Sequence, residues 1–352
     1  MRAACAPGVA VKDNSALLLG TLLGVAAKAG VNELTLVPSP GIRALGPWIE
    51  QLIAESTGKS SQGIIPVVGE ALGKPESYGK HRLFVYLRLE TAPDAEQDTE
   101  IRALEGAGLP VVRIRVASPY AVAEEMMRWE IASAIAGSLL DVNPFRQPIL
   151  QSERAASTLL ESYERSERLP EAAPFFEADG LRLFADPSNR EALQAAVVGQ
   201  PSVAGYLRAH LWRLSAGDYF ALLAYLPRSP AHETALEALR ERVRAARRVA
   251  TSLGFGPRFL HSTGQLHEDG PNSGVFLQLT HDIVEELPVP GKKYGFGVCE
   301  AAQAEGNRAR LSECKRRALC IHLGADLKSG LQSLQRAFDG ALAEHPPAGP
   351  ES

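Results

Sequence analysis

The sequence predicts an α/β protein built on a parallel sheet flanked by helices. Short apolar strands alternate with helical stretches of about ten or more residues through the first 150 residues. This alternation is typical of strand–helix–strand units, whose crossovers place neighbouring strands in parallel. The same alternation returns after residue 200, so we expect an additional α/β portion toward the C-terminus.

The elements of the first half follow from their apolar spacing and their end signals. A helix is expected over 14–30, with Asn14 or Ser15 as its N-cap and Gly30 as the residue that ends it. Apolar residues three and four positions apart predict helices, and compact apolar runs predict strands. In chain order we expect a strand at 33–37, a helix at 42–57, a strand at 82–89, a helix at 99–107, a strand at 110–116 and a helix at 121–140.

The middle of the chain has a different composition. Residues 151–200 hold a helical stretch at 151–167 and then a Pro-, Glu- and Ala-rich stretch. Together these indicate a helical linker or insertion, with a small edge strand at 181–185.

Strands and helices alternate again beyond residue 200. We expect a strand at 219–226, a helix at 232–253, a strand at 275–280, and helices at 294–304 and 308–322. Arginines such as Arg240 and Arg244 cluster on the helix at 232–253, and a solvated helix face explains such a cluster more often than phosphate or nucleic-acid binding. The expected organisation is a domain at 1–150, a linker at 151–200, a C-terminal α/β portion with the histidine loop at 201–344, and a disordered tail at 345–352.

Composition and charge exclude several classes of protein. The 352 residues are 45% hydrophobic and 22% charged, which provides for a buried core and excludes a wholly disordered chain. A net charge of −4 argues against a protein that works on nucleic acid or on an anionic membrane. Four scattered cysteines fit neither a disulfide framework nor a zinc site, so we expect a reducing, cytoplasmic setting. The apolar run at 16–27 has the length of a signal-peptide core, but a capped core helix explains it better, and no stretch is long enough for a membrane span.

A glutamine and a glutamate four residues apart form the first candidate site. Gln51 and Glu55 project from one face of the helix expected at 42–57. Glu55 lies near the helix C-terminus, where the negative end of the helix dipole disfavours the ionised carboxylate, and such a group suits proton abstraction beside a carbonyl. A Gln/Glu pair at this spacing is also common on ordinary helix surfaces. The Gly58-Lys59-Ser60 that follows is not a phosphate loop, because Ile53 occupies the place of its first glycine and a helix leads in.

Two histidines six residues apart form the second candidate site. His261 and His267 flank Gly264-Gln265 in a stretch rich in Gly, Ser and Asn just before a strand, where α/β proteins often carry function. For these histidines we consider two roles more plausible than metal binding: donating a proton to a sugar ring oxygen, or no role beyond that of a loop residue. Metal binding is disfavoured because the neighbouring acidic residues match no common zinc spacing. Farther along, Lys292 and Lys293 in a turn-rich connection are available for anionic contacts, although most such lysines are solvated.

Four stretches of the sequence are distinctive enough to compare with known families. They are residues 48–59 (WIEQLIAESTGK), 143–148 (NPFRQP), the HSTGQLH loop with its GPNSGVFLQLT continuation, and 290–303. Together they resemble glucose-6-phosphate isomerase, in particular the bacterial form fused behind transaldolase. The likeness runs over nearly the whole chain. It implies a sugar-isomerase (SIS), flavodoxin-like sheet and a glycolytic and gluconeogenic enzyme that interconverts glucose 6-phosphate and fructose 6-phosphate without a metal or organic cofactor.

The resemblance also implies roles for individual residues. Glu55 matches the base that moves a proton between C1 and C2 through a cis-enediol, and Gln51 matches a glutamine that contacts the substrate. The family's ring-opening histidine follows a Gly-Gln pair and reaches the site from the partner subunit. This makes His267 the first choice and His261 the reserve, with Gln265 beside the substrate.

Two parts of the family pattern are missing from this sequence. The family's C-terminal active-site lysine has alanine at its place here, so the resemblance leaves Lys293, or else Lys292, as its substitute. The Ser/Thr phosphate loops and the arginine of the family's first SIS domain are also not found. We therefore expect turnover of the hexose phosphate only when an N-terminal isomerase domain is supplied, either by a separate chain or by the rest of a longer gene. The second source is included because the sequence leaves open whether Met1 is the natural start. The shared active site of the family implies a homodimer, and the alternatives are a non-catalytic sugar-phosphate-binding or partner subunit and an inactive fragment.

Overall fold

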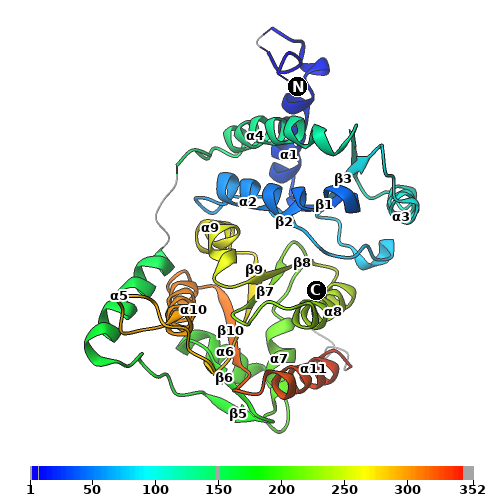
Figure 1. Cartoon of the computed structure of the whole chain (residues 1–352). Coiled ribbons are helices and arrows are strands. Elements are labelled where there is room, and N and C mark those ends of the chain that lie inside the picture. Colours follow the sequence, from blue (N-terminus) through cyan, green and yellow to red (C-terminus); the bar gives the residue numbers. More distant parts are fainter. Residues whose placement is uncertain (1, 7, 147–150, 344–352) are drawn as a thin grey trace. The chain divides into compact units, whose positions relative to one another are not determined.

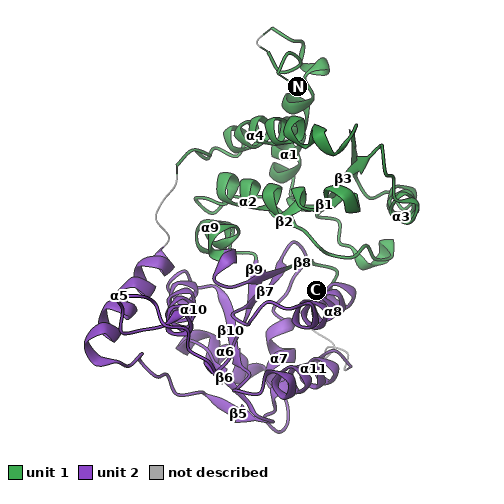
Figure 2. Ribbon diagram, in the orientation of Figure 1, with its two compact units in different colours: residues 1–148, 248–252, 260–273 green, residues 149–247, 253–259, 274–352 purple. Residues whose placement is uncertain are grey.

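The computed structural model describes residues 2–6, 8–146 and 151–343. The chain divides into two units, which Figure 2 shows in different colours. Unit 1 is made of residues 1–148, 248–252 and 260–273, and unit 2 of residues 149–247, 253–259 and 274–352. The histidine segment at 260–273 therefore groups with unit 1, whereas it was expected in the C-terminal portion. The expected tail at 345–352 lies outside the described residues.

Unit 1 contains a four-stranded sheet whose order is β2-β1-β3-β4, with every neighbouring pair parallel. Its strands are β1 (Glu33–Pro38), β2 (Ile65–Val67), β3 (Arg82–Leu89) and β4 (Val111–Val116). Its helices are α1 (Ser15–Lys28), α2 (Leu45–Thr57), α3 (Ala95–Gly106), α4 (Val122–Leu139) and α9 (Gly264–Asp269), as labelled in Figure 1. The α/β class and the parallel sheet flanked by helices are confirmed, and β2, three residues long, has no predicted counterpart.

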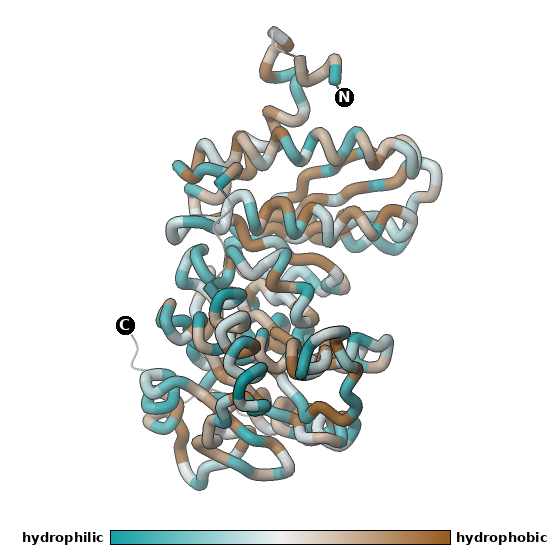
Figure 3. The backbone as a smooth tube through the Cα atoms, turned by 60° about the vertical axis from the view of Figure 1, so that its left-hand side comes forward, coloured by the Kyte–Doolittle hydropathy of each residue, from teal (hydrophilic) through white to brown (hydrophobic). Residues whose placement is uncertain are grey.

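Local signals and burial explain these elements. Asn14 caps α1, because its side-chain oxygen accepts a hydrogen bond from the Leu17 N–H at 3.1 Å. Residues of β3 that point to opposite faces, such as Val85 and Tyr86, are both fully buried, as expected for a parallel strand covered on both sides. Figure 3 shows the strands of unit 1 as hydrophobic segments between its helices.

Two glycines allow α1 to lie directly against α4 (Figure 1). A Cβ atom on Gly20 would lie 2.5 Å from the Ala132 carbonyl oxygen and 2.8 Å from the Ile135 Cβ. A Cβ atom on Gly24 would lie 2.7 Å from the Leu139 Cδ1. Contacts this short involve backbone and branched side chains, so the two helices can approach only where α1 carries no side chain.

We expect Gly20→Ala to lower the free energy of unfolding by about 1–3 kcal/mol, because α4 must move to admit the methyl group. The matched control is Gly106→Ala at the end of α3, where an added Cβ meets no atom within 4 Å. There the better helix propensity of alanine should raise the free energy of unfolding by about 0.5–1 kcal/mol. Urea unfolding followed by circular dichroism measures both, and effects of the same sign would contradict the packing explanation.

The second sheet has six strands in the order β5-β6-β10-β9-β7-β8. They are β5 (Phe176–Ala178), β6 (Leu181–Phe184), β7 (Tyr219–Ala224), β8 (Ala250–Phe255, whose first three residues group with unit 1), β9 (Gly274–Thr280) and β10 (Arg317–His322). The pairs β7–β9 and β9–β10 are parallel, whereas β6 runs antiparallel to both β5 and β10. The helices of unit 2 are α5 (Gln151–Ser166), α6 (Pro187–Ala196), α7 (Val203–Leu211), α8 (Pro230–Arg247), α10 (Phe296–Glu313) and α11 (Leu327–Ala343).

The segment expected to be a linker contributes to the sheet of unit 2. Residues 176–184 form β5 and β6, and β6 lies between β5 and β10 rather than at the edge. Leu181 and Leu183 are fully buried, whereas Arg182 between them is half-buried. This alternation is the period-two pattern of a strand, and it lies in a stretch whose Pro, Glu and Ala content suggested a linker.

Two helices of unit 2 end earlier than predicted, and the prediction was wrong for the same reason in each case. The helix expected at 232–253 ends at Arg247 and is followed by β8. The helix expected at 308–322 is the end of α10 followed by β10. Arg248 and Lys315 stand just after the two helices with φ angles of 55° and 52°. A left-handed residue reverses the chain at a helix end, and a non-glycine residue in that role gives no signal in the sequence.

Most of the predicted arginine cluster (Arg240, Arg242, Arg244, Arg247 and Arg248) is not a solvated helix face, which corrects the prediction, and only Arg248 is exposed. Arg240 and Arg244 are 1% and 6% exposed, and Arg240 donates to the Glu237 carboxylate at 3.1 Å. Arg247 lies over the Trp212 ring at 4.2 Å, and burial lowers the pKa of its guanidinium. These arginines pack within unit 2 instead of presenting charge to a partner. Among the helices described, none has the length and apolar character to cross a membrane.

Candidate functional site at the end of α2

Helix α2 places Gln51 and Glu55 together, as their spacing predicts. The Gln51 side-chain amide donates to the Glu55 carboxylate at 3.2 Å, and both side chains are half-buried. The opposite face of α2 is anchored in the core by Ile49 and Ile53, which are fully buried. The helix ends at Thr57, so Glu55 lies in its last turn.

The loop that follows α2 is shaped by close contact with α9. A Cβ atom on Gly58 would lie 2.7 Å from the Leu266 Cα, and one on Gly63 would lie 2.9 Å from the Leu266 Cδ1. The Ser61 N–H donates to the Asp269 carbonyl oxygen at 2.8 Å. Gly58 and Gly63 therefore have no room for a side chain, and the segment that carries Gln265 and His267 is held against the end of the helix that carries Glu55.

The two histidines of this segment differ in their access to solvent. His267, the first choice from the sequence, is 1% exposed. Gln265 is also buried, and its amide donates to the Asp269 carboxylate at 3.4 Å. His261, the reserve candidate, is exposed. Of the two histidines, only His261 therefore presents its side chain to solvent.

Lys59 is a feature of this site that the sequence analysis missed. It is 4% exposed, and its ammonium donates to the carbonyl oxygens of Asn143 and Pro144 at 3.1 and 3.0 Å and also to that of Arg146. Burial lowers the pKa of Lys59, and the nearby negative charge of Glu55 partly opposes that shift. The ammonium thus supplies positive charge beside Glu55, against the effect of the helix dipole. The sequence gives one indication of this role, which is that Lys59 follows Glu55 by four residues. It lies within Gly58-Lys59-Ser60, the segment that does not qualify as a phosphate loop.

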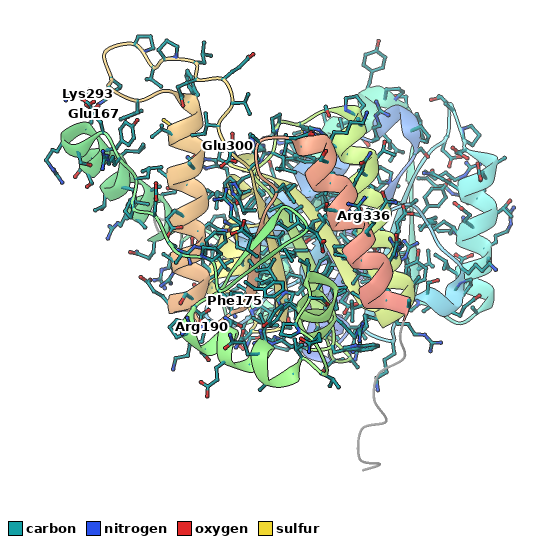
Figure 4. All side chains as sticks on the ribbon, turned by 90° about the horizontal axis from the view of Figure 1, so that it is seen from below. Glu167, Phe175, Arg190, Lys293, Glu300 and Arg336 are labelled. Carbon is teal, nitrogen blue, oxygen red and sulfur yellow. The ribbon has the colours of Figure 1, made fainter. Side chains whose placement is uncertain are left out.

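Lys293 lies in a different unit from the Gln51–Glu55 pair. It belongs to unit 2, where its ammonium donates to the Glu167 carboxylate at 3.1 Å, and Figure 4 shows the two side chains next to each other. Lys292 forms a similar pair with Glu164 at 3.7 Å. Both lysines are thus engaged by carboxylates at the end of α5 or just after it.

Within the described part of the chain, no three His, Cys, Asp or Glu side chains gather in a way that could hold a metal ion. Unit 1 contributes three functional groups to the candidate site. These are a carboxylate held by an amide, a buried ammonium and an exposed imidazole in the same unit.

Comparison with known proteins finds relatives that match part of the chain. A protein named glucose-6-phosphate isomerase from Enterococcus faecalis is 26% identical over 175 residues, which cover 39% of this chain and 39% of that protein. The chain resembles glucose-6-phosphate isomerases over part of its length. A second protein of that name, from Lactobacillus gasseri, is 27% identical over 161 residues, or 36% of each chain. Neither name mentions transaldolase, so the likeness to a transaldolase fusion stays a prediction.

Two further comparisons do not assign the chain to a family or a fold. No family model matches the chain. A solved structure of a hypothetical protein from Thermus thermophilus is 14% identical and covers 96% of this chain and 86% of its own, with a TM-score of 0.33. A TM-score that low does not establish a common fold.

Proposed function

We propose that this chain interconverts glucose 6-phosphate and fructose 6-phosphate, with Glu55 as the base. The observation that carries the proposal is the Gln51–Glu55 hydrogen bond in the last turns of α2. The relatives named glucose-6-phosphate isomerase support the substrate class, and the chain matches about two fifths of the length of each.

The reaction needs one group that can take a proton from carbon and give it back. In the open-chain aldose, the Glu55 carboxylate removes the C2 hydrogen as a proton, the C1–C2 bond becomes the double bond of a cis-enediol, and the C1 oxygen gains a proton. Return of the proton to C1, with loss of the C2 hydroxyl hydrogen, gives the ketose. The Gln51 amide fixes the rotamer of the carboxylate, and the Lys59 ammonium stabilises its ionised form.

Ring opening precedes this proton transfer and needs a second acid. We assign that role to His261 rather than His267, because only His261 of the two is exposed. We expect His261→Asn to slow turnover of the cyclic sugar phosphate by about 10²-fold or more, which is a typical contribution of an acid catalyst. His267→Asn is the comparison, and a larger loss there would return the role to His267.

Turnover by this chain is proposed to depend on an N-terminal isomerase domain or a second subunit. The sequence shows no Ser/Thr-rich phosphate loop, so the binding energy of the phosphate has to come from elsewhere. A homodimer and a separate first domain are both consistent with this proposal.

The test measures proton exchange as well as turnover. Fructose 6-phosphate is incubated with the purified chain in D₂O, and loss of the C1 hydrogen signal is followed by NMR, which detects the enediol even when net conversion is slow. A coupled assay with glucose-6-phosphate dehydrogenase reports net conversion. We expect Glu55→Gln to lower the exchange rate by about 10²–10⁴-fold, since it removes the base. Glu50→Gln on the same helix is the matched control and should keep the wild-type rate.

Three other outcomes would separate the alternatives. Exchange that is the same in wild type and Glu55→Gln would rule out Glu55 as the base. Binding of fructose 6-phosphate in a calorimeter without exchange would favour the non-catalytic sugar-phosphate-binding subunit. Absence of both would rule out activity of the chain alone, and absence of both after an N-terminal isomerase domain is added as a second chain would overturn the proposed activity and favour an inactive fragment.

A further inference from the structure

Unit 2 contains a cavity of about 830 Å³, which is within the size range of pockets for small organic ligands. Its lining includes Thr280, the last residue of β9, and His322, the last residue of β10. Tyr225, just after β7, lines it as well. The cavity therefore lies at the carboxyl ends of three parallel strands, which is where ligands bind in open α/β sheets.

A hydrogen-bonded chain of polar side chains that ends in acceptors lines one part of the cavity. His322 Nε2 lies 3.0 Å from the Asp282 carboxylate, and His322 Nδ1 lies 3.0 Å from the Thr280 hydroxyl. Because a carboxylate can only accept, Nε2 carries the ring hydrogen, and the neutral ring then accepts the Thr280 hydrogen at Nδ1. Burial lowers the pKa of His322, which keeps the ring neutral. Thr280 thus offers lone pairs and no hydrogen to a ligand, although the Cys320 sulfur, 3.9 Å away, approaches the same oxygen.

The charges around the cavity leave negative charge in excess. Arg182 donates to Asp282 at 3.2 Å, and Arg308 forms two hydrogen bonds to Glu305 at 2.9 and 2.6 Å. Both lining guanidiniums are therefore paired. Glu300 on α10, labelled in Figure 4, also lines the cavity. Burial raises the pKa of Glu300, and its Oε1 has no hydrogen-bond partner among the described residues.

The rim of the cavity is apolar and open to solvent. Val284, Leu287 and Phe296 line it and are 68%, 66% and 54% exposed. Large apolar side chains left exposed around a cavity are typical of a ligand-binding rim. A ligand that suits both parts of the lining has an apolar body, which contacts the rim, and a hydrogen-donating head, which contacts the polar side chains.

We propose that this cavity is a second binding site for a small organic cation, whose ammonium or similar head meets Glu300 and Thr280 while its apolar body lies against the rim. The excess of carboxylates and the pairing of both arginines disfavour a sugar phosphate there. The site is thus distinct in chemistry from the one proposed at the end of α2.

Calorimetry with two isosteric probes tests the charge requirement. At pH 7, 2-phenylethylamine is a cation and 2-phenylethanol is neutral with the same apolar body. We expect the amine to bind one-to-one and about tenfold more tightly than the alcohol, since a charge-assisted hydrogen bond adds about that much affinity. Glu300→Gln should remove the difference between the probes, whereas Glu177→Gln at an exposed position of β5 should keep it.

A second variant keeps the test informative if Glu300→Gln fails to fold. Ala301→Trp places bulk in the cavity without changing charge, and it should abolish binding of both probes. Retention of amine binding in folded Ala301→Trp would overturn the proposal. Equal affinity of the two probes, or displacement of the amine by glucose 6-phosphate, would also overturn it. Loss of isomerase activity in Glu55→Gln has no bearing on these titrations, so the two proposals fail separately.

Discussion

Replacing Arg82 by methionine is expected to lower the free energy of unfolding by about 3–5 kcal/mol, because it leaves two carboxylates buried without their counter-ion. Arg82 is fully buried, and its guanidinium lies 3.4 Å from both the Glu33 and the Glu70 carboxylates. It also donates to the Thr35 hydroxyl at 2.8 Å and to the Val249 carbonyl oxygen at 3.0 Å. Arg82 therefore ties β1, β3 and the returning 248–252 segment of unit 1 together.

The same environment explains why the loss should be large. Burial raises the pKa of Glu33, and Arg82 is the main charge that opposes this shift. The matched control is Arg113→Met, which breaks a half-exposed pair with Glu105 and should cost at most about 1 kcal/mol. Combining Arg82→Met with Glu33→Gln and Glu70→Gln should recover part of the stability. Similar losses at Arg82 and Arg113 would contradict the buried-counter-ion explanation.

Acidification is expected to destabilise unit 2 through His210. This histidine is fully buried, its Nε2 lies 3.0 Å from the Phe276 carbonyl oxygen, and burial lowers its pKa to about 3. Between that value and the ordinary pKa of about 6.5, the unfolded chain binds a proton that the folded chain does not. Stability from this group is complete above pH 6.5 and is lost as the pH falls toward 3, at about 1.4 kcal/mol per pH unit.

The His210 contribution can be isolated by comparing variants across pH. His210→Gln keeps a side-chain donor but cannot titrate, so the fall in its free energy of unfolding between pH 6.5 and pH 4 should be about 3 kcal/mol smaller than in the wild type. His232→Gln is the control, because His232 is only half-buried. Urea midpoints at several pH values measure the effect. A wild-type pH dependence in His210→Gln would show that other groups cause the acid sensitivity.

The parts of the fold that were predicted well are those with strong local patterns. Helix α4 was expected at 121–140 and spans 122–139, and β3 was expected at the residues where it lies. The helix ends after Arg247 and Glu313 could not be predicted, because the left-handed residues that follow are Arg248 and Lys315 rather than glycine. The local pattern of apolar residues predicts that a helix or strand is present. The point where it ends depends on backbone conformations that cannot be predicted from most residue types.

In the candidate site, too, the features that follow from local sequence patterns were predicted and those that depend on distant segments were not. The contact between Gln51 and Glu55 follows from helical spacing, and the structure contains it. The burial of Lys59 and His267 and the exposure of His261 depend on segments that are far apart in the sequence. No pattern within a short window carries that information, so these features needed the structure.

The discontinuity of unit 1 has a consequence for how the protein is made. The end of α2 is completed only when residues 260–273 arrive, because Gly58 and Gly63 pack against Leu266. On a ribosome that adds about 5–20 residues per second, α2 emerges roughly ten seconds or more before its partner segment is synthesised. During that interval the nascent chain exposes an unfinished surface, and contacts this distant in sequence form slowly. Synthesis of this protein should therefore depend more on chaperones than its size alone suggests, and ribosome profiling of chaperone-bound nascent chains would show that dependence ending once residue 273 has left the exit tunnel.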